Sequence, residues 1–286
     1  MHPFHRTELL VGRKGWARLQ RSSVLIVGLG GVGSFAAEAI ARAGVGRIGL
    51  VDFDDVCITN LNRQLHAFRR TVGLPKSGLM AERCRLINPK AEVIDNATFF
   101  SAETSEALLA PGWDWVIDCI DNVTAKLHLL ETVSRRGLPV VAAMGAGSKL
   151  DPTRVQLSEL AHTRVDPFAK VIRKELRRRG VDIHNILAVW SDEPPVVLDQ
   201  DVADAFHCVC PSGDNGMHSC DDRNVVQGTV SFMPSLFGLM ASGAVVNGII
   251  NRPLRGVDVG RRMFGELEPN EAPAAEAGLA APALAK

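Results

Sequence analysis

The sequence predicts an α/β protein built on a doubly wound, mostly parallel sheet that is extended by antiparallel strands in the C-terminal half. Three observations lead to this prediction. Short runs of branched apolar residues alternate with helical patterns along the first 145 residues. A glycine-rich turn separates the first run from a helix, and acidic residues follow the second and fourth runs. The carboxyl ends of parallel strands meet at one edge, so these features are expected to lie together.

The first half, about residues 20–145, is expected to form the parallel part of the sheet and to bind a nucleotide. The predicted strands comprise residues 23–27, 47–51, 92–94, 115–117 and 139–143. The predicted helices comprise residues 34–43, 76–87 and 123–136. The connection over residues 53–74 is long for a compact domain, which indicates a functional loop.

In the second half, about residues 146–267, predicted strands and helices no longer alternate regularly. It contains isolated predicted strands at 154–157, 187–190 and 228–233, and a basic helix at 167–179. We expect these strands to continue the same sheet, so that residues 1–267 form a single domain. Residues 268–286 are rich in alanine, proline and glutamate, a composition that predicts a disordered tail.

Composition is ordinary for a globular protein with a buried core. Of the 286 residues, 46% are apolar and 22% charged, and the formal net charge is zero. Bulk charge therefore requires neither a nucleic-acid nor a membrane partner, although a local basic patch stays open. No secretory pattern is visible near the N-terminus, and the six cysteines are interpreted as free thiols, which predicts a cytoplasmic protein.

The uncharged segment 225–251 has the length of a membrane span. However, it carries Pro234 and several glycines. A strand followed by a buried helix that starts at this proline explains the pattern better, so we predict no stable membrane span.

Gly28, Gly30 and Gly33 form a G-x-G-x-x-G motif between a strand and a helix, with Gly31 inside it. Glycine permits positive φ and close approach of the backbone to a phosphate, which the helix N-terminus attracts. Asp52 ends the second strand 19 residues after Gly33, where a carboxylate can accept hydrogen bonds from ribose hydroxyls. The motif predicts a Rossmann-like nucleotide site but does not separate NAD from ATP.

The loop after Asp52 favours ATP. Polar and charged residues crowd into it and its end: Asp54, Asn60, Asn62, Arg63, Gln64 and Lys76. Arg63 and Lys76 can neutralise phosphate charge, and Asp54 or Asp121 can hold a Mg²⁺ ion that bridges phosphates. A hydride-transfer enzyme needs none of these groups.

The glycine loop, "VDFDDVCITNLNRQ", the helix start at Lys76 and "VIDCIDN" resemble the ThiF/MoeB superfamily over residues 4–145. Members of that superfamily, which includes the ubiquitin-activating enzymes, adenylate a carboxylate with ATP. The resemblance implies that Asp52 binds ribose, that phosphates contact Asn60, Arg63 and Lys76, and that Asp121 lies beside Mg²⁺ and the α-phosphate. The full nucleotide-binding set expected is Gly28, Gly30, Gly31, Gly33, Asp52, Asp54, Asn60, Arg63, Lys76, Asp118, Asp121 and Asn122.

The catalytic residues expected are Arg6, Arg63, Lys76 and Asp121. The stretch "FHRTELLVG" resembles the segment from which the superfamily sends an arginine into the ATP site of the partner subunit. It implies a homodimer with shared sites. The alternative for Arg6 is an ordinary surface charge near the chain end.

The second half resembles the tRNA threonylcarbamoyladenosine dehydratase family, which extends the resemblance to residues 4–252. The matching stretches are "GAGSKLDPTRVQLSELAHTRVDPFAKVIRKELRRRGV", "VWSDEPP" and "GTVSFMPSLFGLMASGAVV". The resemblance implies an enzyme that adenylates the carboxylate of threonylcarbamoyladenosine at position 37 of tRNA and cyclises it with loss of AMP. The alternative is an activator of a ubiquitin-like sulfur carrier, whose usual two zinc-binding C-x-x-C pairs this chain lacks.

The cysteine-rich stretch 208–222 misses the usual zinc spacing and is expected to be a loop with free thiols that can cover the active site. A cysteine relay is doubtful, since "RNVVQGTVSF" contains no cysteine. Docking of a sulfur-transfer protein is left open.

The RNA-binding residues expected lie on the basic helix: Lys170, Arg173, Lys174, Arg177 and Arg178. They can contact phosphates; the alternative is a solvated helix face.

Overall fold

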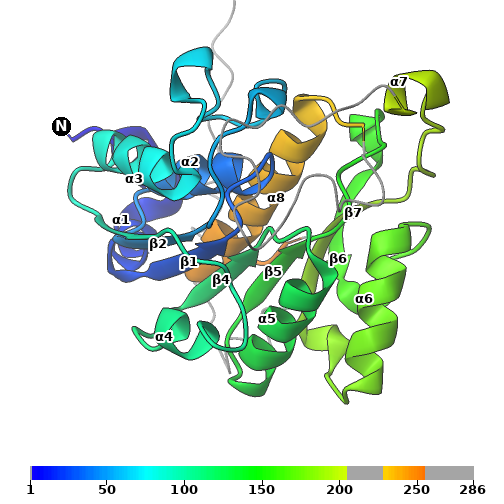
Figure 1. Cartoon of the computed structure of the whole chain (residues 1–286). Coiled ribbons are helices and arrows are strands. Elements are labelled where there is room, and N and C mark those ends of the chain that lie inside the picture. The colour runs from blue at the N-terminus through cyan, green and yellow to red at the C-terminus, as the bar shows by residue number, and fades with distance from the viewer. Residues whose placement is uncertain (1, 205–227, 255–286) are drawn as a thin grey trace, which may run out of the picture.

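The computed structural model describes residues 2–204 and 228–254, which contain one seven-stranded sheet (Figure 1). The strands are β1 (Ser23–Val27), β2 (Arg47–Val51), β3 (Glu92–Asn96), β4 (Trp115–Asp118), β5 (Val140–Ala143), β6 (Val155–Glu159) and β7 (Leu187–Ser191). Their order is β3-β2-β1-β4-β5-β7-β6. All neighbours run parallel except β6 and β7. The predicted fold class is therefore confirmed, with β6 as its antiparallel extension.

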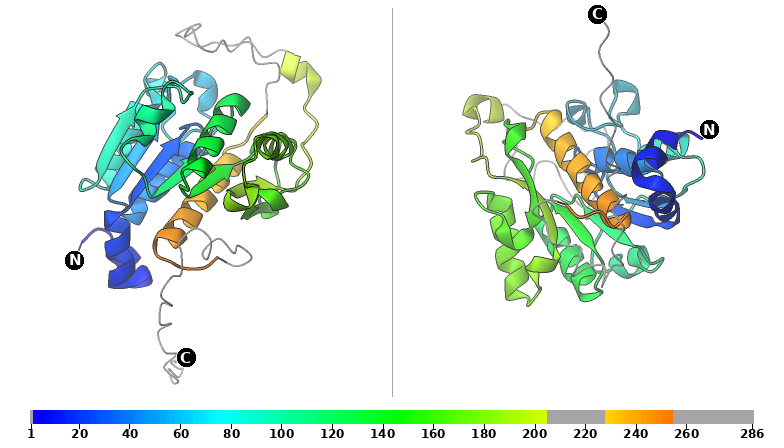
Figure 2. Two further views of the ribbon diagram at one scale, coloured as in Figure 1. Left: turned by 90° about the horizontal axis from the view of Figure 1, so that it is seen from below. Right: turned by 180° about the vertical axis from the view of Figure 1, so that it is seen from behind.

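Helices cover both faces of the sheet (Figure 2). One face carries α2 (Gly33–Ala43), α3 (Lys76–Ile87) and α8 (Phe232–Ile249), and α1 (His5–Arg21) packs beside α8. The other carries α4 (Ser105–Leu109), α5 (Val123–Arg135) and α6 (Pro167–Arg178), and the short α7 (Gln200–Asp204) follows β7. Alternation within β1 shows why two layers form, since Val24 and Ile26 join one core and Leu25 and Val27 the other.

The strand order reverses between β1 and β4. From β1 the chain proceeds outward through β2 to β3, whereas β4 starts the opposite half of the sheet. Open parallel sheets bind ligands beyond the carboxyl ends of the strands where the order reverses. The residues that follow β1, β2 and β4 are therefore the ones that line the expected site.

The prediction of a strand at 228–233 is wrong. The carbonyl oxygen of Gly228 accepts a hydrogen bond from the Ser148 N–H at 2.7 Å, and that of Thr229 accepts one from Asn62 Nδ2 at 3.0 Å. The chain then enters α8 at Phe232. Pro234, which has no N–H, is suited to the first turn of a helix. The carbonyl groups of Gly228 and Thr229 therefore accept hydrogen bonds from loop residues and not from a neighbouring strand.

In the described part of the chain, α8 is the one helix that is long and apolar enough to cross a membrane, and half of its residues are buried within the protein. A Cβ added at Gly238 would lie 2.3 Å from the Val32 carbonyl oxygen, so glycine is needed for this close approach. Ser242 Oγ also donates to the Ala36 carbonyl at 3.1 Å. The helix is therefore part of the core, as its glycines predicted.

One difference concerns the N-terminal part of the chain. The strand and helix patterns did not predict α1, which contains Arg6. The predicted tail 268–286 and the predicted loop 208–222 lie outside the described residues.

Candidate nucleotide site

The glycine turn after β1 requires glycine at its two ends. Gly28 has φ of 88°, and a Cβ there would lie 2.8 Å from the Cys119 carbonyl oxygen. A Cβ at Gly33 would lie 1.7 Å from the Gly28 carbonyl oxygen. By contrast, a Cβ at Gly30 would meet only Gln64 Nε2, at 3.8 Å. The backbone at Gly30 is therefore open to a ligand, while the ends hold the turn tight against the sheet.

Asp52 is fixed to this turn. Its Oδ2 accepts a hydrogen bond from the Leu29 N–H at 2.5 Å, and its Oδ1 accepts one from the Asp54 N–H at 2.9 Å. Burial raises the pKa of the Asp52 carboxyl above its usual range, and the positive charge of Lys76 opposes that rise. The carboxylate therefore lies beside the glycine turn, as its predicted ribose-binding role requires.

The long loop closes on itself. A β-bridge between Asp55 and Pro75 brings its two ends together, and the Lys76 N–H donates to the Asp54 carbonyl at 3.0 Å. The first residue of α3 thereby lies next to the end of β2, although 22 residues separate Asp54 from Lys76. The closure places both ends of this connection beside the residues that follow β2, where the site is expected.

Lys76 is surrounded by carboxylates. Its Nζ lies 2.7 Å from Asp54 Oδ2, and the residue is only 5% exposed. Burial alone would lower the pKa of Lys76, but the charges of Asp52, Asp54 and Asp121 raise it above the ordinary value. The side chain therefore stays protonated, and three acidic residues from the ends of two strands converge on it.

Arg63 and Asn60 belong to the same loop. Asn60 is buried, and its Oδ1 accepts a hydrogen bond from the backbone N–H of Cys57 at 3.0 Å. Arg63 NH1 donates to the Thr59 carbonyl and to Asn62 Oδ1, both at 3.0 Å. The stem of Arg63 borders the glycine turn, since a Cβ at Gly31 would lie 3.3 Å from its Cγ. Arg63 therefore lies beside the glycine turn, as its expected phosphate contact requires.

The turn after β4 presents Asp121. Asp118 and Lys126 are both fully buried and form an ion pair of 2.7 Å, and Lys126 Nζ also donates to the Ile120 carbonyl at 2.9 Å. Burial raises the pKa of the Asp118 carboxyl, with Lys126 opposing the rise. Asn122 caps α5 through its Oδ1. Asp118 and Asn122 thus hold the backbone on both sides of the exposed Asp121.

The sequence analysis did not predict the buried charged residues near the carboxyl ends of the strands. Lys126 lies on the buried stripe of α5 with Leu130 and Val133, and a lysine at such a position is the signal that was available. Asp166, 1% exposed, caps α6 and lies against Gly145 just after β5. Its position directly before Pro167 is the signal that was available for the cap, whereas nothing local indicated its burial.

The structure separates Arg6 from the other predicted catalytic residues. Arg6 is exposed on α1, and its neighbours Phe4 and Thr7 line a hollow together with Leu86, near the C-terminal end of α3. Lys76 begins the same helix, and 12 residues span about 17 Å. Within one subunit, Arg6 therefore lies at the opposite edge of the sheet from the nucleotide site.

The basic helix α6 exposes only part of its predicted set. Three side chains are exposed at i, i+4 and i+7 and form no ion pair among the described residues: Lys170, Lys174 and Arg177. Arg173 NH1 instead donates to the Thr163 carbonyl at 2.6 Å, and burial lowers its pKa. Arg178 pairs with Glu175 at 2.7 Å. One stripe of three cations is therefore open to solvent.

Together the fold and this site define a nucleotide-binding α/β protein with a phosphate-suited loop. The chain belongs to the ThiF family, whose model matches residues 4–264. It is 44% identical, over 246 residues, to the tRNA threonylcarbamoyladenosine dehydratase of Bacillus subtilis, covering 86% of this chain and 94% of the relative.

Solved structures agree with this relationship. The crystal structure of Escherichia coli tRNA N6-threonylcarbamoyladenosine dehydratase, TcdA, in complex with ATP matches with a TM-score of 0.73 and 34% identity. The match covers 87% of this chain and 93% of that one. A sulfur carrier protein adenylyltransferase of Thermus thermophilus is also 34% identical, but over 140 residues, which is 48% of this chain and 51% of the relative.

Proposed function

We propose that this protein is an ATP-dependent tRNA-modifying enzyme. It adenylates the carboxylate of threonylcarbamoyladenosine at position 37 of tRNA and cyclises the product with loss of AMP. The observation that carries the proposal is the buried Lys76 among Asp52, Asp54 and Asp121, next to an open glycine turn. The relationship to dehydratases over nearly the full chain supports the choice of substrate.

Each group has a part in the first step. Asp52, held at the glycine turn, accepts hydrogen bonds from the ribose. Lys76 exchanges its contact with Asp54 for phosphate oxygens, and Arg63 adds a second cation beside the turn. These cations stabilise the charge that develops as pyrophosphate departs, while the turn holds the α-phosphate in line with the substrate carboxylate.

A Mg²⁺ ion fits the same edge of the sheet. The exposed carboxylate of Asp121, between two residues that fix its backbone, is an oxygen ligand of the kind that this ion prefers. When bound, Mg²⁺ would neutralise phosphate charge there.

The second step needs no enzyme thiol. Adenylation joins the substrate carboxylate to the α-phosphate and releases pyrophosphate. The carbamoyl nitrogen of the same nucleoside then attacks the activated carbonyl carbon, the C–O bond to phosphate breaks, and AMP leaves with the electron pair as the nitrogen loses its proton. Burial raises the pKa of the Cys119 thiol, which lies directly against the glycine turn, so this cysteine is a poor nucleophile.

The exposed stripe of α6 is the surface proposed to meet the tRNA backbone. Lys170 lies one turn after Asp166, which packs next to Gly145 at the carboxyl edge of the sheet. Phosphates along the stripe would therefore lead toward the adenylation site. We place this enzyme in the cytoplasm, where its tRNA substrate is made.

We further propose a homodimer in which Arg6 acts on the nucleotide of the partner subunit. Arg6 lies too far from the site of its own subunit, as the length of α3 shows. Apolar side chains are exposed around it on α1 and α3, with Leu9 72%, Leu10 78% and Leu86 79% exposed. Such a patch is typical of a surface that a second copy covers.

The test is nucleoside mass spectrometry of tRNA incubated with protein and ATP. We expect threonylcarbamoyladenosine to lose one water with the parent protein and to persist with Lys76→Ala. Pyrophosphate exchange is measured in parallel, with tRNA that lacks the modification as the control. Exchange driven by a carrier protein with a Gly-Gly tail, and not by modified tRNA, would assign the chain to sulfur-carrier activation instead.

A further inference from the structure

A second group of chemically reactive side chains lies away from the nucleotide site. Glu159 ends β6, His162 belongs to the short 3₁₀ helix Leu160–His162, and His184 belongs to the 3₁₀ helix Ile183–Asn185. In sequence, α6 lies between the two histidines. In space the two short helices pack against each other and against α6.

The three side chains converge on one point. Nδ1 of His184 lies 2.7 Å and Nδ1 of His162 3.8 Å from the same oxygen, Oε2 of Glu159. The three potential ligand atoms all lie within 4.8 Å of one another. Ligands of a tetrahedral zinc ion are roughly 3.4 Å apart, given bonds of about 2.1 Å, so small rotations about side-chain bonds suffice to complete a site.

The backbones that carry these ligands are already fixed. Leu160, beside Glu159, is fully buried and its N–H donates to the Ile186 carbonyl at 2.8 Å. Ile183 is buried, and Asp182 caps the second short helix by accepting the His184 N–H at 3.0 Å. Ordering these loops therefore adds little entropic cost to binding an ion.

We propose that Glu159, His162 and His184 bind a first-row divalent transition metal ion, with zinc as the expected ion, that joins the segment before the basic helix α6 to the segment after it. Two imidazoles and one carboxylate suit zinc, nickel or copper, whereas magnesium and calcium favour oxygen ligands alone. Three protein ligands leave a position open for water. The exposure of both histidines gives the ion access.

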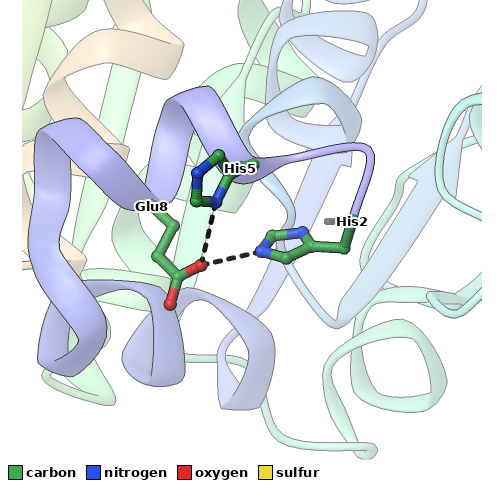
Figure 3. A group of neighbouring side chains, drawn as sticks. All are labelled: His2, His5 and Glu8. Atoms are coloured by element: carbon green, nitrogen blue, oxygen red, sulfur yellow. Dashed lines mark hydrogen bonds and ion pairs between the residues drawn. The ribbon is translucent and has the colours of Figure 1, made fainter.

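A similar group near the N-terminus consists of His2, His5 and Glu8 (Figure 3). His2 Nε2 faces Glu8 Oε2 at 2.8 Å, and His5 Nδ1 lies 3.8 Å from the same oxygen. However, His2 Nδ1 accepts a hydrogen bond from the Phe4 N–H at 3.2 Å. The ring proton therefore resides on Nε2, which donates to Glu8 and has no lone pair for a metal. This group is the matched control.

The test is a Co²⁺ titration of the full chain after removal of metals with EDTA, followed by competition with Zn²⁺. Cys208, Cys210 and Cys220, which lie outside the described residues, are replaced by serine so that thiolates do not contribute. We expect one saturable equivalent of Co²⁺, without thiolate charge-transfer absorption. The equivalent should be lost in E159Q and in H162A/H184A and retained in H2A/H5A. Equal binding in parent and H162A/H184A would mean adventitious ions only and would overturn the proposal.

Hydrogen exchange tests the role of the site. Zn²⁺ should slow amide exchange in the segments on either side of α6, residues 160–166 and 182–186, by tenfold or more in the parent and not in H162A/H184A. Metal binding without this protection would refute the proposal that the ion joins the segments on either side of α6. Neither measurement uses ATP or tRNA, so failure here is distinguishable from failure of the proposed enzymatic function.

Discussion

Replacement of Lys126 by methionine tests the buried ion pair that supports the end of β4. Met has nearly the length of lysine but no charge, so the substitution leaves Asp118 with its main counter-charge gone in a site that is fully buried. The Ile120 carbonyl also loses the donor 2.9 Å away. The turn that carries Asp121 should loosen as a result.

The expected cost follows from the burial of both partners. Breaking such a pair by removing one member costs about 3–5 kcal/mol. For a chain of this size, each kcal/mol lowers Tm by about 2–4 °C, so Lys126→Met should lower it by roughly 6–20 °C. The double variant Asp118→Asn/Lys126→Met should recover most of that loss, because it removes the uncompensated charge.

Urea and thermal unfolding measure the effect, with Lys90→Met as the control because Lys90 is exposed. Pyrophosphate exchange at a temperature where the variant stays folded tests the link to Asp121. If Lys126→Met unfolds within about 1 kcal/mol of the parent, or if the double variant is no more stable than the single one, the ion pair does not support the turn.

Other substitutions probe the proposed roles separately. Lys76→Ala should slow pyrophosphate exchange by about 100-fold or more, and a near-normal rate would remove Lys76 from the phosphate site. Arg6→Ala mixed with Lys76→Ala should restore one functional site per mixed dimer, whereas independent subunits would restore none. Lys174→Ala/Arg177→Ala should reduce the salt slope of tRNA binding by about 1.5; an unchanged slope would place the RNA elsewhere. Burial, with the nearby lysine and arginine charges, lowers the pKa of His66 from 6.5 to about 4. The unfolded chain therefore binds more protons below pH 6.5, and stability should fall by on the order of 3 kcal/mol between pH 6.5 and 4, a loss that His66→Phe should abolish in urea titrations.

Features decided by neighbouring residues were predictable from the sequence. The helix over residues 76–87 was predicted with its observed bounds, and its end was indicated by Asn88-Pro89 directly after it. The glycine turn was predicted from its G-x-G-x-x-G motif between a strand and a helix, and the structure leaves no room for a Cβ at Gly28 or Gly33. The start of α6 was indicated by Asp166-Pro167, and Asp166 caps it.

Features that depend on contacts between residues far apart in the sequence were not predictable. The segment 228–233 has the composition of a strand, but Ser148 and Asn62, remote in sequence, take its backbone bonds. The helical spacing of the basic residues likewise did not indicate that Arg173 donates to the Thr163 carbonyl. The separation of Arg6 from Lys76 follows from the packing of α1 near the end of α3, which no local pattern encodes.

The charges around Lys76 explain why more than one cation must serve the proposed reaction. Asp52, Asp54 and Asp121 surround a single lysine, so this part of the site carries excess negative charge before any nucleotide binds. A triphosphate entering it would be repelled unless further positive charge arrives with it or stands nearby. Arg63 beside the glycine turn supplies one such charge, and a Mg²⁺ ion on Asp121 would turn one of the repelling carboxylates into a ligand. The acidic residues keep Lys76 charged inside the protein, and under the proposed function we expect them to make tight ATP binding depend on the metal-bound form of the nucleotide.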